Sequence, residues 1–140
     1  MKIVLDTNVW LSAVFWSGEA EKIIESREKF EILISEDILK EITEVLDKET
    51  KFQKFIEDRK QKIEELIRTI LSISTLTSTL SKVDIIKHKK DNIILELALD
   101  GKADYIISYN KHILDLIEFK GIRILSPGDF LKLIKTFNLS

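Results

Sequence analysis

The stretch Lys2-Ile3-Val4-Leu5-Asp6-Thr7-Asn8-Val9 decides the fold of this 140-residue chain. Its apolar residues form a short continuous run, which is typical of a buried parallel strand. The run ends in an acid and two small polar residues, after which a helical pattern begins. In open α/β sheets ligands bind just beyond the carboxyl ends of the strands, so Asp6 lies where a metal-binding carboxylate is useful. The alternative is that Asp6 or Thr7 only caps the following helix.

Strand and helix patterns alternate along the rest of the chain. Strands are predicted over Lys2–Leu5, Phe30–Ile34, Ala103–Ser108 and Ile122–Leu125. Helices are predicted over Asn8–Trp16, Glu19–Ser26, Glu36–Lys48, Phe52–Leu71, Asp91–Asp100, Lys111–Phe119 and a last segment after Ser126. Ser72–Ser81 is of less certain type, with a short strand and a loop as one interpretation. The alternation predicts an α/β fold with a mostly parallel sheet and helices on both faces.

Composition predicts one domain over residues 1–140. Apolar residues make up 44% and charged residues 33% of the chain, which excludes a disordered protein. The absence of cysteine excludes disulfides, thiolate metal sites and a cysteine nucleophile. No apolar run approaches the roughly 20 residues that cross a bilayer. Because Met1 leads directly into a strand, a signal peptide has no room, and we expect a cytoplasmic protein.

Two further acids lie beside the apolar faces of predicted helices. Glu41 comes three residues after Ile38 and four before Val45, so it borders an apolar stripe. The alternative is that Glu41 is a surface residue whose aliphatic carbons lie along the core while its carboxylate reaches solvent. Asp91 starts the inward face of its helix, and Ile94 stands where a capping box needs Glu or Gln. Carboxylates that converge at one sheet edge form a hard oxygen site for Mg²⁺ or Mn²⁺, which suits phosphodiester hydrolysis.

Basic side chains flank this predicted site. They are Lys87, His88, Lys89, Lys90, Lys111 and His112. Positive charge beside acids suits a site that holds both a divalent metal and a phosphate backbone, although a single charge run is usually only a solvated surface. Neither histidine has a His, Cys or Glu partner at helical ligand spacing. We therefore interpret both as surface or phosphate-contacting residues and not as zinc ligands.

Four short motifs, in this order and spacing, resemble the PIN-domain nucleases over nearly the whole chain. They are Asp6-Thr7-Asn8-Val9, the segment 35–42 that contains Glu41, the segment 90–98 that begins Lys-Asp-Asn-Ile, and the segment 103–110. The resemblance is to the branch that includes the VapC-like toxins of type II toxin–antitoxin pairs.

This resemblance implies a three-layer α/β/α sandwich and a Mg²⁺- or Mn²⁺-dependent endoribonuclease. The catalytic acids of the family match Asp6, Glu41 and Asp91 in this sequence. The supporting polar groups near the metal match Thr7, Asn8 and Ser108. The resemblance also implies a homodimer and an antitoxin protein as partner.

Two positions depart from the family pattern. The family has a fourth acid in a Thr-Gly-Asp turn, where this chain reads Ser108-Tyr109-Asn110. The usual acid-Pro pair ahead of the third acid is replaced by His88-Lys89. Because Asn110 offers a carbonyl oxygen but no charge, we expect weaker metal binding and reduced activity.

We therefore predict a toxin-type ribonuclease that cleaves single-stranded RNA. Asp6 and Asp91 are expected to hold the metal, Glu41 to bind it or orient a water, and Asn110 to be a weak ligand or to lie just behind the ligands. The residues expected to contact RNA phosphates are Lys87, Lys89, Lys90 and Lys111. The alternative is a catalytically weak PIN domain that binds RNA or a protein without cutting, and Asn110 favours it.

Overall fold

The fold is built on a six-stranded sheet with the strand order β3-β2-β1-β4-β6-β5. The computed structural model describes residues 1–48 and 59–137. The strands are β1 (Lys2–Leu5), β2 (Glu31–Ile34), β3 (Thr75–Leu76), β4 (Tyr105–Ile107), β5 (Glu118–Phe119) and β6 (Ile122–Leu125). Neighbouring strands pair in parallel except β5 and β6, which are antiparallel. The predicted mostly parallel α/β sheet is confirmed.

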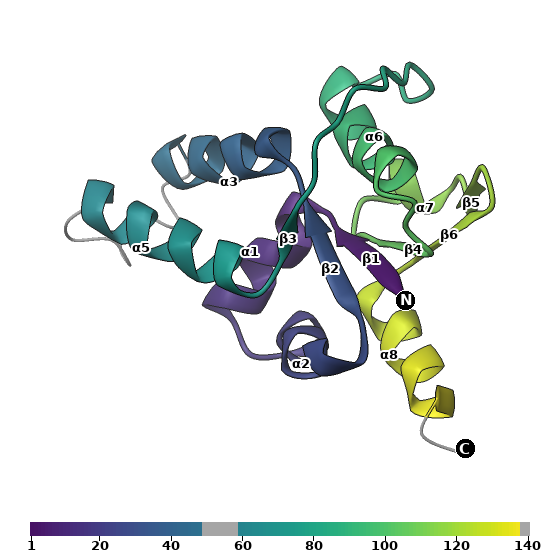
Figure 1. Ribbon diagram of the computed structural model, residues 1–140, viewed down its shortest axis with the longest axis horizontal. Coiled ribbons are helices and arrows are strands. Elements are labelled where there is room, and N and C mark those ends of the chain that lie inside the picture. The colour runs from purple at the N-terminus through teal and green to yellow at the C-terminus, as the bar shows by residue number, and fades with distance from the viewer. Residues whose placement is uncertain (49–58, 138–140) are drawn as a thin grey trace.

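Helices enclose this sheet, as expected for parallel strands that are buried on both faces. They are α1 (Thr7–Phe15), α2 (Glu19–Glu25), α3 (Glu36–Lys48), α5 (Arg59–Ser72), α6 (Asn92–Asp100), α7 (Lys111–Leu114) and α8 (Pro127–Thr136), with single 3₁₀ turns η1 (Arg27–Lys29) and η2 (Lys89–Asp91). Figure 1 shows α3 and α5 to one side of β1 and β2, and α6 and α8 to the other. Helix α6 packs on β1, β2 and β4, and α2 packs against both α1 and α8.

The opening strand lies in the middle of the sheet and is fully enclosed. Ile3, Val4 and Leu5 have no exposed surface, which explains why this stretch is continuously apolar. From β1 the chain proceeds outward through β2 to β3, then returns to β4 on the other side of β1. The gap between β1 and β4 is therefore a topological switch point, where α/β sheets bind ligands at their carboxyl edge.

The region that was predicted as one helix over Lys111–Phe119 is a short helix followed by a strand. Helix α7 ends at Leu114, and Glu118–Phe119 pairs with β6 as an antiparallel hairpin. Lys120 and Gly121, between the two strands, have φ values of 49° and 83°. Positive φ at both residues of a two-residue turn matches the right-handed twist of a β-hairpin. The turn at Lys120 and Gly121 therefore reverses the chain and makes Glu118–Phe119 a strand instead of the end of a helix.

Two other predictions concern the helix that ends in α5 and the segment that follows it. The helix predicted from Phe52 lies partly outside the described residues, and its described part is α5. Segment 72–81 contains β3 as its short strand, followed by an extended loop. Among residues 1–48 and 59–137, no helix is long and apolar enough to cross a bilayer.

Candidate active site

Asp6 lies at the carboxyl end of the central strand, where the sheet changes direction. Because Leu5 pairs with Ile107, the next residues, Asp6 and Ser108, lie side by side. The Ser108 hydroxyl donates to Asp6 Oδ2 at 2.8 Å, and the Thr7 N–H donates to Oδ1 at 2.8 Å. Burial raises the pKa of Asp6, these two hydrogen bonds lower it, and Asp91 raises it further. Each carboxylate oxygen keeps a second acceptor position that the described residues leave open.

Glu41 reaches the same edge from α3. Ser35 follows β2 and caps this helix by accepting a hydrogen bond from the Ile38 N–H at 3.2 Å. Burial raises the pKa of the half-buried Glu41 carboxyl, Thr7 and Lys90 lower it, and Asp6 and Asp91 raise it. Glu41 therefore lies close enough to both aspartates for its charge to interact with theirs.

Asp91 completes this group of acids from a third element. It ends η2 and immediately precedes α6, and its side chain forms no capping hydrogen bond there. A role as a helix cap therefore explains part of what Asp6 does, since Asp6 accepts from the Thr7 N–H, but it does not explain Asp91. The structure brings together Asp6, Glu41 and Asp91, the three acids expected from the sequence, and we refer to them as the acid cluster.

The oxygen atoms of the acid cluster fit a divalent cation that keeps several of its waters. In the described part of the chain, no three His, Cys, Asp or Glu side chains are already gathered tightly around one point. Mg²⁺ needs only one or two direct carboxylates and holds the others through water, so a looser group suits it. Thr7 Oγ1 is buried and lacks a hydrogen bond of normal geometry to any described residue, although the hydroxyl lies near Glu41. The Thr7 hydroxyl therefore belongs to the polar surroundings of the acid cluster.

The predicted supporting residues differ in what they contact. Ser108 is fully buried and joins two parts of the site, because it donates to Asp6 and accepts from the Asn110 N–H at 2.9 Å. Asn110 uses its side-chain oxygen to cap α7 by accepting from the His112 N–H at 2.9 Å. Asn110 is thus linked to Asp6 through Ser108. Asn8 is exposed on α1.

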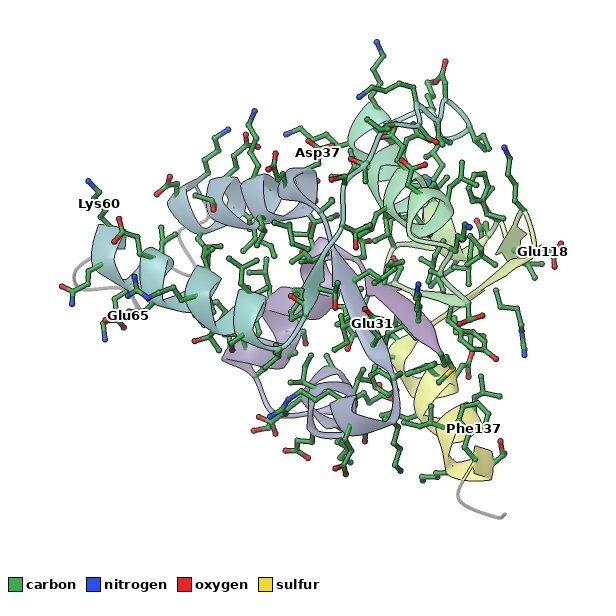
Figure 2. All side chains as sticks on the ribbon, viewed as in Figure 1. Glu31, Asp37, Lys60, Glu65, Glu118 and Phe137 are labelled. Carbon is green, nitrogen blue, oxygen red and sulfur yellow. The ribbon has the colours of Figure 1, made fainter. Side chains whose placement is uncertain are left out.

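The four lysines expected at phosphates are all exposed, and Lys90 is the one whose charge is shown to reach the acid cluster. Lys90 Nζ lies 3.8 Å from Glu44 Oε2, and its charge also reaches Glu41. Lys87, Lys89 and Lys111 lie on the segments that adjoin Asp91 and Asn110. Beside Glu41, a hollow of about 330 Å³ between α3 and α6 is lined by charged side chains of both signs. Asp37, labelled in Figure 2 at the start of α3, is one of them.

Three polar residues of α6 hold the loop that leads into the basic run, and sequence reasoning missed them. Asn92, Glu96 and Asp100 are spaced four residues apart, so they share one face of the helix. Asn92 bonds the backbone of Ile85 and Ile86, Glu96 accepts from the Val83 N–H, and Asp100 accepts from Leu80 and Ser81. The four-residue spacing on an otherwise apolar helix was the available signal. These side chains fix the approach to Asp91.

The two histidines also form a pair that sequence spacing did not indicate. His88 comes from the turn before Asp91 and His112 from α7, and their ring centroids lie 5.6 Å apart. Both are exposed, so they are surface residues. The expectation that neither is a zinc ligand rested on sequence spacing alone, and spacing did not reveal this ring contact.

Comparison with known proteins identifies the family. The PIN domain family model matches residues 2–112. The chain belongs to the PIN domain family. PIN domains are generally nucleases that use divalent metals, and the acid cluster of this PIN domain lies at the carboxyl edge of its sheet.

A solved structure supports the fold of this PIN domain. The structure of VapBC2 from Rickettsia felis, bound to a DNA fragment from its promoter, matches with a TM-score of 0.65 and 15% sequence identity. The match covers 90% of this chain and 98% of the other. Among curated proteins, none matches this chain significantly.

Proposed function

We propose that this PIN domain is a Mg²⁺- or Mn²⁺-dependent endoribonuclease that hydrolyses phosphodiester bonds in single-stranded RNA. The observation that carries the proposal is the acid cluster, in which carboxyl groups from β1, α3 and the turn before α6 interact electrostatically. Clustered acids that are left without a cation repel one another, which makes such a group costly as a purely structural feature. The position at the switch point supports the same conclusion.

The residues of the chain take distinct roles in this proposal. Asp6 and Asp91 would hold the cation, and Glu41 would either bind it or orient the attacking water by accepting a hydrogen bond from it. When bound, the cation lowers the pKa of that water and offsets negative charge on the phosphate. Ser108 and Thr7 N–H fix the orientation of the Asp6 carboxylate. The substrate phosphates are bound by Lys87, Lys89, Lys90 and Lys111.

The test is cleavage of unstructured RNA with Mg²⁺ or Mn²⁺, with and without EDTA. We expect cleavage to disappear with EDTA, with Asp6→Asn and with Asp91→Asn. Glu118→Gln removes an exposed acid from β5, at the edge of the sheet (Figure 2), and should leave the rate unchanged. RNAs that stay intact over a full titration of both metals would contradict the nuclease proposal.

The second candidate is an RNA- or protein-binding module with little catalytic activity. Asn110 favours it, because its side-chain oxygen caps α7 and it brings no charge to the acid cluster. In that case the RNA binds without being cut, and Asp6→Asn leaves its affinity unchanged.

A toxin role within a toxin–antitoxin pair belongs to the same proposal. It is supported by the similarity of fold to the VapBC2 structure and by the motif resemblance. The expected partners are an antitoxin encoded in a neighbouring reading frame and a second copy of this chain. Coexpression with that neighbour should relieve growth arrest in the host and yield a complex on gel filtration. Growth that is unaffected by expression of the chain alone would contradict the toxin role.

A further inference from the structure

His88 and His112 form a side-chain pair that the proposed reaction does not use. They are 24 positions apart in the sequence and come from two different elements, yet their rings are in contact. The ring planes are tilted by 51°, so the imidazoles do not stack in parallel. His88 comes three residues before Asp91, and His112 comes two residues after Asn110, which is linked to Asp6 through Ser108.

The main chain of each histidine is anchored, while the imidazoles stay open. The His88 carbonyl accepts from the Asp91 N–H at 2.9 Å, and the His112 N–H donates to Asn110 Oδ1 at 2.9 Å. Both side chains are exposed, and no ring nitrogen of either bonds a described residue. The ring nitrogens of both histidines are therefore available to a ligand.

The separation of the rings fits one shared metal ion. Zn²⁺ binds imidazole nitrogen at about 2.0–2.1 Å with tetrahedral geometry, which places two ring centroids roughly 5–6 Å apart. The observed separation is 5.6 Å. We propose that His88 and His112 bind a single borderline-soft divalent cation of the Zn²⁺ class, separate from the hard-cation site of the acid cluster, with waters completing the coordination.

The two sites differ in their ligand chemistry. Imidazole nitrogen prefers Zn²⁺, Ni²⁺ and Cu²⁺, whereas the carboxylates of the acid cluster suit Mg²⁺ and Mn²⁺. Lys87, Lys89 and Lys111 adjoin the histidines and oppose a cation by their charge, but they are exposed and their long side chains can turn away. A phosphate would satisfy these lysines without any contact between the rings. Shared coordination of one metal ion requires the two rings to lie this close together, whereas phosphate binding does not.

An ion at this pair joins two segments across the rim of the site. One is the turn that leads into Asp91, and the other is the start of α7, which Asn110 caps. A bound cation that prefers the folded chain raises the free energy of unfolding by mass action. Zn²⁺ should therefore stabilise the protein and hold the rim in one conformation.

Proton NMR of the imidazole carbon-bound protons tests the proposal directly, since the chain has only two histidines. The full chain is kept in saturating Mg²⁺ and titrated with Zn²⁺. We expect both histidine signals to shift together and to saturate at one ion per chain. His88→Ala and His112→Ala should each raise the Kd for Zn²⁺, measured from the signal of the remaining histidine, by about tenfold or more. Loss of a residue that only hydrogen-bonds to a metal ligand already lowers metal affinity by about 10–100-fold.

Lys60→Ala is the control and should titrate as the wild type does, because Lys60 belongs to α5, on the opposite side of the molecule from α7 in Figure 1. A Zn²⁺ titration that shifts neither signal, or one whose shift of His112 survives His88→Ala, would overturn the proposal. So would a concerted shift of both signals with inorganic phosphate but not with Zn²⁺, which would assign the pair to an anion.

Discussion

Asn92→Ala is the substitution whose effect the structure specifies most fully. Asn92 is 2% exposed, and its side chain makes three hydrogen bonds to the loop that precedes the acid cluster. Oδ1 accepts from the N–H groups of Ile86 at 2.9 Å and Ile85 at 3.2 Å, and Nδ2 donates to the Ile86 carbonyl at 2.8 Å. Alanine removes all three bonds and offers no replacement.

The magnitude depends on which of the freed backbone groups reach water. Ile85 is 54% exposed, so its N–H can bond solvent instead. Ile86 is only 7% exposed, and both its N–H and its carbonyl lose their partner. A buried polar group without a partner costs about 1–3 kcal/mol, so two such groups predict a loss of about 2–6 kcal/mol. For a domain of this size, that is a fall in Tm of roughly 6–24 °C.

Urea unfolding of the metal-free protein at pH 7 measures this loss, with Asn8→Ala as the matched control. Asn8 is exposed, and its removal should change the free energy of unfolding by less than about 0.5 kcal/mol. The slope of the transition should be the same in all three proteins. An Asn92→Ala variant that is within about 0.5 kcal/mol of the wild type would refute the reasoning, because the loop would then not depend on these bonds.

Three further predictions concern the charges of the site. Burial raises the pKa of Asp6 and Glu41. The free energy of unfolding of the metal-free protein is therefore highest below the unfolded pKa of these groups, about 4, where both are protonated. It falls as the pH rises through their raised pKa values in the folded protein. Asp6→Asn or Glu41→Gln should therefore leave metal-free stability at neutral pH unchanged or higher while reducing stabilisation by Mn²⁺; a large loss of stability with an unchanged metal response would contradict this. Asn110→Asp should keep the cap of α7 and raise Mn²⁺ affinity by about tenfold or more, measured by isothermal titration, and an unchanged Kd would place residue 110 outside the reach of the metal. The double variant Lys89→Ala, Lys111→Ala should reduce the salt dependence of RNA binding, whereas Lys60→Ala should not.

The fold could be predicted from the sequence wherever local pattern and tertiary environment agree. The continuous apolar run before Asp6 is buried on both faces, and its appearance as a central strand follows from that burial. The segment after Leu114 shows the limit of this reasoning. Its helical pattern continues, but the positive φ values of Lys120 and Gly121 turn the chain into a hairpin against β6.

The site was predictable in part for a different reason. Acids at the ends of strands and helices can be located along a sequence, and the parallel sheet brings them to one edge. Contacts between side chains from distant segments leave no such periodic signal. The pairing of His88 with His112 depends on how the turn before α6 meets α7, and the bonds of Asn92 depend on the course of the preceding loop. Neither is encoded by spacing alone.

The two interpretations of Asp6, as a helix cap and as a metal ligand, prove compatible. Its Oδ1 accepts from the Thr7 N–H at the start of α1, as a capping residue does. A carboxylate that only capped a helix would be favoured in its charged form, and its pKa would fall. The pKa of Asp6 is instead raised, because two hydrogen bonds do not offset burial and the nearby charge of Asp91. The fold thus holds Asp6 where its charge is disfavoured, and a bound cation would remove that cost.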